Sequence, residues 1–297
     1  MTPEILERIR SLELDVMGRV EGLLQGDHRG LLPGPGGEAG DARPYVPGDD
    51  VRRIDWSVTA RARRPHVRDT TADHELETTL VVDASGSMCF GSAAVEKWQV
   101  AMAAAAVFGF LTDRAGDRVG AFIMGAERPA MPARPGRAHV YSILAAVEEA
   151  AARSAKVDLE EALERTRRLR RRRGFVAVIS DFADETEWWR PLRALAAAHD
   201  VVAVEVSDER ERRLSPVGVV RMIDPERGNR AWIDTSDAEV RRRFEAEAAA
   251  RAEAVARRLA GCGVSHIRIS TGSDWVGQLI AAVSGRRRML AEAGRSR

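Results

Sequence analysis

The sequence predicts an α/β protein built on a doubly wound, mostly parallel sheet. From residue 77 onward, short runs rich in Val and Ile alternate with segments of helical periodicity. The runs are apolar along their whole length, which is typical of strands buried on both faces. Strands that alternate with helices favour a parallel sheet covered by helices on both sides. The expected strands are residues 78–82, 118–124, 175–179, 201–206 and 266–270.

Helices are expected between these strands, and some of their ends carry sequence signals. The helix expected at 158–172 has acidic residues near its start and arginines near its end, as the helix dipole favours. Gly174 follows it where a C-terminal glycine belongs. Ser236 and Glu239 form a capping box that begins a long helix ending near residue 261. The other helices are expected at 93–111, 140–152, 191–199 and 275–283.

The first quarter of the chain has a different character. Apolar residues recur at helical spacing from Ile5 to Leu23, which predicts an N-terminal helix. Residues 26–47 are rich in Gly and Pro and predict a long irregular segment. We therefore expect residues 1–76 to form a helix and loop module, and residues 77–297 to form one α/β domain.

Composition excludes several classes of partner. Lys and Arg number 46 against 45 Asp and Glu, and this balance argues against nucleic acid or an anionic membrane as the partner. Two cysteines, Cys89 and Cys262, are too few for a disulfide framework and indicate a reduced, cytoplasmic protein. The longest apolar run, 100–111, is shorter than the roughly twenty residues of a membrane span, so no membrane insertion is expected.

The most informative motif is LVVDASGSM at residues 80–88, where an apolar strand ends in Asp83-x-Ser85-x-Ser87. Asp181 follows the strand expected at 175–179 in the same way. Since ligands of open parallel sheets bind at the carboxyl ends of the strands, we expect these side chains to converge. Their oxygens suit a hard cation, Mg²⁺ or else Mn²⁺ or Ca²⁺. The alternative left open is that Ser85 or Ser87 only caps the next helix.

Other chemistries at this motif are not favoured. A nucleophile elbow has the pattern G-x-S-x-G, but Ser85 follows Ala84 and Asp83. No histidine falls in an expected strand-end loop where it would complete a triad. A phosphate loop would be rich in glycine and carry a lysine, whereas Gly86 stands alone.

Two sets of residues carry a family resemblance. Asp83-x-Ser85-x-Ser87 with Asp181 resembles the metal-ion-dependent adhesion site of von Willebrand factor A domains. Residues 43–61 resemble the signature of a bacterial family catalogued as domain of unknown function 58, and the similarity covers nearly the whole chain. The signature residues are Arg43, Tyr45, Pro47, Gly48, Asp49, Asp50, Arg52, Asp55, Trp56 and Arg61.

The resemblance implies a von Willebrand factor A-like, Rossmann-like fold and association with MoxR-type AAA+ ATPases. It also implies a metal shell completed by a threonine, in a region that often reads G-T-D-L. Here that region reads Ala155-Lys156-Val157-Asp158-Leu159, and Val157 has no oxygen to offer. A Mg²⁺ ion is therefore expected to bind weakly or not at all, and Asp158 is expected to start its helix.

The signature stretch also has a physical interpretation. Pro47-Gly48 favours a type II turn, and Asp49 and Asp50 favour Asx turns. Its charged residues would form charge-assisted pairs that fasten the module to the α/β domain, with Tyr45 and Trp56 as apolar anchors. A partner-contact surface is the alternative. The charged residues meant are Arg43, Arg52, Arg53, Asp55 and Arg61.

Two further features have competing interpretations. The basic runs 167–173 and 286–288 are expected to be solvated faces, with Glu161 and Glu164 pairing with arginines one helical turn further on. The pair Trp188-Trp189 would be either an interface hot spot or a buried helix start.

These observations favour a non-enzymatic interaction or scaffold protein. It would work with a MoxR-type AAA+ ATPase in assembling or remodelling a protein complex, and a carboxylate of a partner would complete the metal shell. The chain has no phosphate loop, so it is not expected to be the ATPase. The alternative is a metal-assisted hydrolase that uses the oxygens of Asp83, Ser85, Ser87 and Asp181.

Overall fold

The computed structural model separates into two compact units, one comprising residues 33–76 and the other the rest of the chain. Apart from Glu7, which is helical, the helix predicted between residues 5 and 23 lies outside the described residues, as do Pro47, Gly48, Asp49, Asp50 and Arg52. The described residues are 7, 42–46, 51, 54–68, 77–92, 95–114, 116–153, 157–170, 173–223, 229–275, 277–279 and 281–282.

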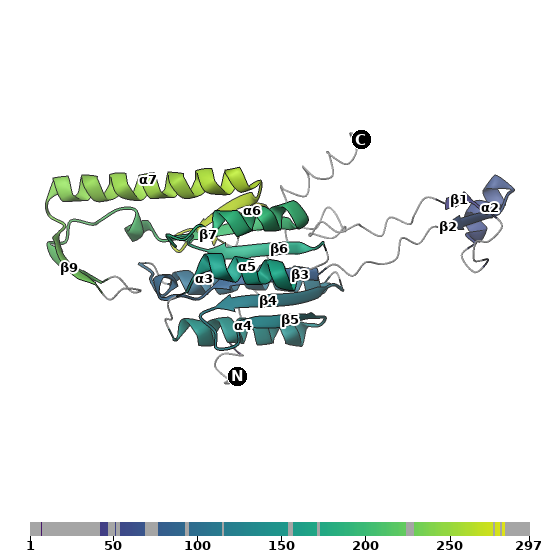
Figure 1. Ribbon diagram of the computed structural model, residues 1–297, viewed down its shortest axis with the longest axis horizontal. Helices are drawn as coiled ribbons and strands as arrows, with labels where there is room; N and C mark the ends of the chain where they lie inside the picture. Colours follow the sequence, from purple (N-terminus) through teal and green to yellow (C-terminus); the bar gives the residue numbers. More distant parts are fainter. Residues whose placement is uncertain are drawn as a thin grey trace. The chain divides into compact units, whose positions relative to one another are not determined.

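The larger unit is built on a six-stranded sheet with the order β10-β7-β6-β3-β4-β5 (Figure 1). Five strands run parallel, and the prediction of a doubly wound, mostly parallel sheet is confirmed. The first strand of the sheet, β3, is central. The chain adds β4 and β5 on one side of it and then β6, β7 and β10 on the other, so the order reverses between β3 and β6. The strands are β3 (Glu77–Asp83), β4 (Arg118–Met124), β5 (Ala130–Arg134), β6 (Phe175–Ser180), β7 (Asp200–Ser207) and β10 (Ser265–Ser270).

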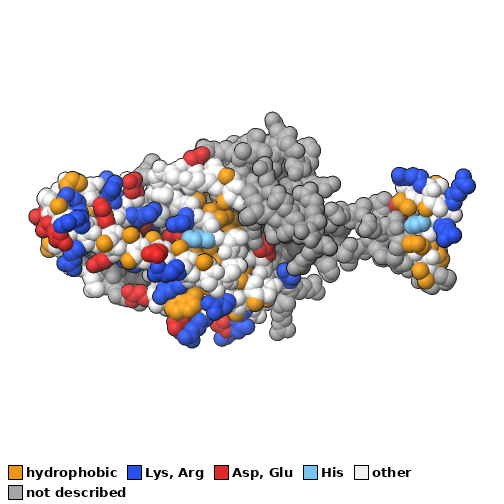
Figure 2. Space-filling model, turned by 90° about the horizontal axis from the view of Figure 1, so that it is seen from above, with side chains coloured by type: hydrophobic (Ala, Val, Ile, Leu, Met, Phe, Trp, Pro, Cys, Tyr) orange, Lys and Arg blue, Asp and Glu red, His pale blue; other side chains and the backbone are white. Residues whose placement is uncertain are grey.

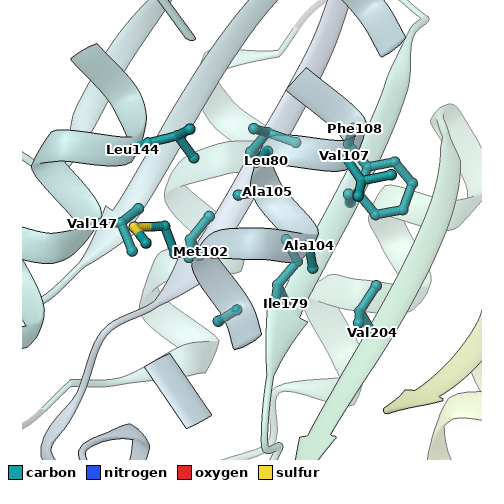
Figure 3. Close-up of a cluster of buried hydrophobic side chains, with 14 of the residues drawn as sticks. Leu80, Met102, Ala104, Ala105, Val107, Phe108, Leu144, Val147, Ile179 and Val204 are labelled. Atoms are coloured by element: carbon teal, nitrogen blue, oxygen red, sulfur yellow. The ribbon is translucent and has the colours of Figure 1, made fainter. Parts of the chain in front are cut away.

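Helices cover both faces of the sheet, and the side chains of β3 show why. Leu80 and Val82 pack into a cluster with α3 and α4, while Val81 between them packs into a second cluster on the opposite face. Alternate residues of a strand point to opposite faces, so a strand covered on both sides must be apolar throughout. Figure 3 shows the first cluster, in which Leu80 and Phe108 are fully buried. The helices are α3 (Lys97–Arg114), α4 (Arg137–Ala151), α5 (Leu159–Leu169), α6 (Trp189–Ala198) and α7 (Ala238–Cys262).

Several helix ends differ from the prediction by a few residues. Helix α3 begins at Lys97 rather than at residue 93, because residues 95 and 96 are described and are not helical. Asp237, not Ser236, caps α7 by accepting a hydrogen bond from the Glu239 N–H at 2.8 Å. None of the helices in the described part of the chain is long and apolar enough to cross a membrane.

In the larger unit three strands were not predicted from the sequence, and all are largely exposed; the two strands of the smaller unit were not predicted either. The edge strand β5 pairs antiparallel with β4 and contains Pro132. Strands β8 (Val219–Ile223) and β9 (Arg230–Asp234) form an antiparallel pair within a stretch expected to be turns. Acidic and basic side chains are interspersed over the face of the larger unit in Figure 2, in keeping with the balanced net charge.

The smaller unit contains a short antiparallel pair and one helix. Strand β1 (Ala42–Pro44) pairs with β2 (His66–Arg68), and α2 (Trp56–Ala62) lies between them in the chain. Val67 on β2 is buried, and Ile54 pairs with it as an isolated bridge. None of the α2 residues is buried, and the described part of this unit is joined by the backbone pairing of β1 with β2.

Candidate functional site

The turn after β3 presents the predicted motif in a fixed geometry. Asp83 ends β3, and its Oδ1 accepts a hydrogen bond from the Ser85 N–H at 2.9 Å. Ser85 caps a single 3₁₀ turn, η2 (Gly86–Met88), but its side chain makes no capping hydrogen bond. Its hydroxyl instead lies 3.0 Å from that of Ser87. The two hydroxyls therefore point to the same side, as the alternating motif predicts, and side-chain capping does not explain them.

Strand β6 brings the second aspartate to the same place. The Ser180 hydroxyl at its end donates to Oδ2 of Asp83 at 2.6 Å and joins the two strand ends. Asp181 follows, and its carboxylate accepts a hydrogen bond from the Ala183 N–H at 3.0 Å. The structure thus brings all four predicted residues, Asp83, Ser85, Ser87 and Asp181, into one strand-end site.

A buried lysine that the sequence analysis did not identify completes this site. Lys97 begins α3, and its side chain is only 1% exposed. Its Nζ lies 2.8 Å from Oδ2 of Asp181 and 2.5 Å from Oε1 of Glu211. A buried ammonium is tolerated when carboxylates neutralise it and accept its hydrogen bonds. Lys97 is therefore an integral cation of the strand-end site.

Glu211 is held in position by the segment that follows β7. Asp208 caps a short 3₁₀ helix, η3 (Glu209–Glu211), and the Asp208 N–H donates to Oε2 of Glu211 at 3.2 Å. Asp208 is itself fully buried and accepts hydrogen bonds from the hydroxyls of Ser92 at 2.6 Å and Thr271 at 2.5 Å. These contacts join the ends of β7 and β10 to the loop before α3.

Two causes set the pKa values in the site: burial of its groups, and the charges of Lys97 and its neighbouring carboxylates. Burial and the nearby charge of Asp181 raise the pKa of Asp83 to about 6. Burial opposes ionisation of Asp181, but Lys97 outweighs it and holds the pKa of Asp181 below its usual range. Burial alone would lower the pKa of Lys97, yet the two carboxylates raise it above its ordinary value. Burial raises the pKa of Glu211, and Lys97 offsets this only in part.

As arranged, these residues do not fit the divalent ion that an adhesion-type site implies. Such an ion would have to share the Asp181 carboxylate with the buried ammonium of Lys97, and like charges repel strongly where water does not screen them. The described residues contain no group of three or more His, Cys, Asp or Glu side chains able to hold a metal, so binding would depend on the serine hydroxyls. An oxygen at position 157 would have strengthened the shell.

Val157 and Asp158 have structural roles beside the site. Val157 packs partly buried against the second core cluster, and Asp158 caps α5 by accepting from the Glu161 N–H at 2.8 Å, as expected. Val157 also lines an open groove of about 390 Å³ together with Met124. Met124 pairs with Asp83 across β3 and β4, so the groove lies next to the strand-end site.

The described signature residues bond locally within the smaller unit. Asp55 caps α2, because its Oδ1 accepts from the N–H groups of Ser57 at 2.9 Å and Val58 at 3.1 Å. Arg61 donates to the Ser57 carbonyl at 3.3 Å. Within this unit Tyr45 is half-buried and Trp56 is 73% exposed, and their expected role as apolar anchors stays a prediction. Arg43 lies on β1.

Burial decides between the two interpretations of the tryptophan pair, whereas residues 171, 172 and 286–288 of the basic runs lie outside the described residues. Trp188 is fully buried against Phe182 and donates its indole N–H to the Asp184 carbonyl at 3.2 Å, so the tryptophan pair is a buried helix start. The expected pairs of the basic run are present, with Arg165 bonded to Glu161 at 2.5 Å on an exposed face. Arg170 is the exception, since it is largely buried and bonded to Glu77.

The strand order, the acidic strand ends and the hydroxyls of the turn define an α/β protein of the von Willebrand factor A type. More particularly, the chain belongs to the family described as "Protein of unknown function DUF58", whose model matches residues 41–254. The family resemblance seen in the sequence is thereby confirmed.

Similar proteins are known in mycobacteria and among solved structures. The uncharacterized proteins Rv1480 of Mycobacterium tuberculosis and Mb1516 of Mycobacterium bovis are each 46% identical over 289 residues, which is 96% of this chain and 91% of theirs. BatB from Bacteroides thetaiotaomicron has a TM-score of 0.45 at 14% identity, covering 72% of this chain and 99% of its own. The SpRpn10 VWA domain has a TM-score of 0.40 at 8% identity, covering 69% and 93%.

Proposed function

We propose that this chain is a non-enzymatic, cytoplasmic interaction protein whose strand-end site is a docking surface. The observation that carries the proposal is the way the polar groups of the site are satisfied. The hydroxyls of Ser85 and Ser87 bond to each other, Asp83 accepts the Ser85 N–H and the Ser180 hydroxyl, and the ammonium of Lys97 bonds to two carboxylates. Because these polar groups already bond to one another, they hold the site in a fixed shape, which suits a docking surface better than a catalytic centre.

Among the described residues of the site, no histidine or neutral lysine lies next to the serine hydroxyls to act as their base. A serine nucleophile needs a histidine or a lysine that can take its proton. His266 lies on the edge strand β10 and bonds to Glu205 at 2.6 Å, away from the strand-end site. Lys97 is held in its charged form by Asp181 and Glu211, so it cannot act as a base. The metal-assisted hydrolase is therefore the less favoured candidate.

The surface that a partner would meet is narrower than the four-residue motif. Asp83 and Ser85 are buried, with exposed fractions of 4% and 1%. Ser87 is half-buried, and 37% of the Glu211 side chain is exposed. A partner would thus contact Ser87 and Glu211 first, next to the groove lined by Val157 and Met124.

We further propose a MoxR-type AAA+ ATPase as the partner, acting with this chain to assemble or remodel a protein complex. The support is the family resemblance of residues 43–61, since such ATPases typically accompany the family. The interaction would not need a base or a catalytic metal in this chain, which accords with a site whose polar groups are already bonded.

Binding of the purified MoxR-type ATPase from the same organism tests the proposal. Ser87→Arg places a long cation on the rim of the site, and we expect it to weaken binding at least tenfold in a pull-down or by calorimetry. Ser142→Arg on the exposed face of α4 is the matched control and should leave binding unchanged.

Two checks make the result interpretable. Circular dichroism and Tm should show that both variants fold like the wild type. If Ser87→Arg folds and captures the ATPase as well as Ser142→Arg does, the strand-end site is not the docking surface. Esterase or phosphatase activity that disappears in Asp83→Ala would instead favour the hydrolase.

A further inference from the structure

The strand-end site contains its own cation. We infer that the ammonium of Lys97 takes the place that a divalent ion has in a metal-ion-dependent adhesion site, so that the site keeps its shape without metal. The inference concerns the ion and does not depend on which partner binds. It follows from three features of the described residues: the contacts of Lys97, the fixing of its second carboxylate, and the choice of lysine over arginine.

The contacts of Lys97 bring three distant segments together. Asp181 lies 84 residues away at the end of β6, and Glu211 lies 114 residues away in η3. The ammonium is bonded to both at 2.8 Å and 2.5 Å, with its side chain almost entirely out of solvent. A metal ion in such a site has the same task, which is to hold carboxylates of separate loops at one point. Lys97 performs it with a covalently attached charge.

The second carboxylate is prepared for this role. Glu211 directs one oxygen to Lys97 and accepts the Asp208 N–H on the other, so its side chain is fixed at both oxygens. Asp208 is in turn bonded to Ser92 and Thr271. An incidental surface ion pair would not need this support, because exposed pairs tolerate several geometries. The structure therefore builds a receptor for one ammonium.

The residue type is also unusual for this chain. Lysine stands at two positions, Lys97 and Lys156, while arginine supplies the rest of the 46 basic residues. A guanidinium is planar and wide, whereas an ammonium is a compact point charge on a flexible stem. Only the compact group resembles a metal ion in size and in its ability to bond to oxygens in several directions. The use of lysine at position 97 fits that requirement.

If the inference is right, the protein without the Lys97 ammonium should be stabilised by a divalent metal ion. We would measure Tm of the wild type and of Lys97→Met in millimolar MnCl₂ or MgCl₂, against NaCl of equal ionic strength. The wild type should show no specific shift. Lys97→Met should have a lower Tm in NaCl and regain about 3 °C or more with Mn²⁺, because an ion that binds only the folded state stabilises it.

A matched variant locates the ion. Adding Ser87→Ala to Lys97→Met removes a hydroxyl of the site, and it should reduce the gain from Mn²⁺ by at least half. Arg165→Met, which removes an exposed cation from α5, should neither lower Tm nor create a response to Mn²⁺. A Mn²⁺ response of Lys97→Met that Ser87→Ala leaves intact would overturn the inference.

Calorimetric titration of the wild type with Mn²⁺ decides the matter if Lys97→Met does not fold. Saturable binding that Ser87→Ala abolishes would show that metal and lysine coexist, and it would overturn the inference. If the wild type binds no Mn²⁺, the inference is supported. It is supported further if the variant Lys97→Met/Asp181→Asn, in which both partners of the ion pair are neutral, folds without added metal. Failure of the partner experiment above would leave this result unaffected, since no partner is present here.

Discussion

The strand-end site and the described part of the signature unit differ in the range of the hydrogen bonds that their charged residues make. In the site, Lys97 is buried and bonds to carboxylates 84 and 114 residues away. In the signature unit, Asp55 and Arg61 bond to groups two to four residues away, and no residue of α2 is buried. Long-range buried charges fix a geometry between loops, whereas local capping fixes only one turn of helix. The strand-end motif therefore fixes the positions of separate loops, whereas the described residues of the 43–61 signature stabilise their own short helix.

The contrast predicts its largest effect at Asp181. Asp181→Asn leaves the buried ammonium of Lys97 with one carboxylate, that of Glu211, where it had two, so the cost of burying the charge is less well compensated. We expect the free energy of unfolding to fall by about 3 kcal/mol. Urea unfolding followed by tryptophan fluorescence measures it.

Asp113 provides the control for that variant. Its ion pair with Arg137 is longer, at 3.7 Å, and the Arg137 side chain is 53% exposed. Asp113→Asn should therefore cost less than about 1 kcal/mol. Equal losses in the two variants would contradict the central role given to Lys97.

A smaller decrease in the free energy of unfolding is expected for a substitution at Asp208, whose N–H bonds to Glu211. Asp208→Ala leaves the buried Thr271 hydroxyl and the Ser92 N–H without their acceptor. The expected cost is about 2 kcal/mol, the usual penalty for an unsatisfied buried polar group. Combined with Glu211→Gln, the loss should be less than the sum of the two, because Asp208 also positions Glu211. Strict additivity in the urea experiment would argue that the two residues act separately.

The central sheet and the four motif residues were predictable because their signals are local. A strand buried on both faces is apolar along nearly its whole length, and the interiors of β3, β4, β6 and β7 are, with Thr79 and Glu205 among the polar exceptions. Asp83 and Asp181 then follow from the rule that ligands gather at strand ends. Strands β5, β8 and β9 escaped notice because they are largely exposed, and exposed strands need no continuous apolar run.

Lys97 could not be identified in the same way. It stands at the start of an alanine-rich helix, where a single lysine is usually a solvated side chain. Its burial depends on Asp181 and Glu211, and a pairing across 84 or 114 residues leaves no trace in the local pattern. The one available signal was compositional, namely the rarity of lysine in a chain so rich in arginine.

The signature unit should respond locally to its own cap. Asp55→Ala removes the acceptor of the first N–H groups of α2, and loss of such a cap typically costs about 1 kcal/mol of helix stability. Hydrogen exchange followed by mass spectrometry should show faster exchange in residues 56–62 and no change in residues 77–92. Faster exchange in both segments would mean that Asp55 also supports the larger unit.

The smallest effect is expected on the exposed arginine face of α5. Arg165 pairs with Glu161, but both side chains are more than half exposed, and water screens such pairs while side-chain entropy opposes them. Arg165→Ala should leave Tm unchanged within error.

Arg170→Ala is the comparison. Arg170 follows the end of α5, is only 13% exposed and bonds to Glu77 at the start of β3. Its replacement should lower Tm measurably, since its aliphatic stem and charge are both buried. Equal Tm values for the two variants would mean that burial does not separate structural from solvated cations here, and would count against a structural role for Lys97.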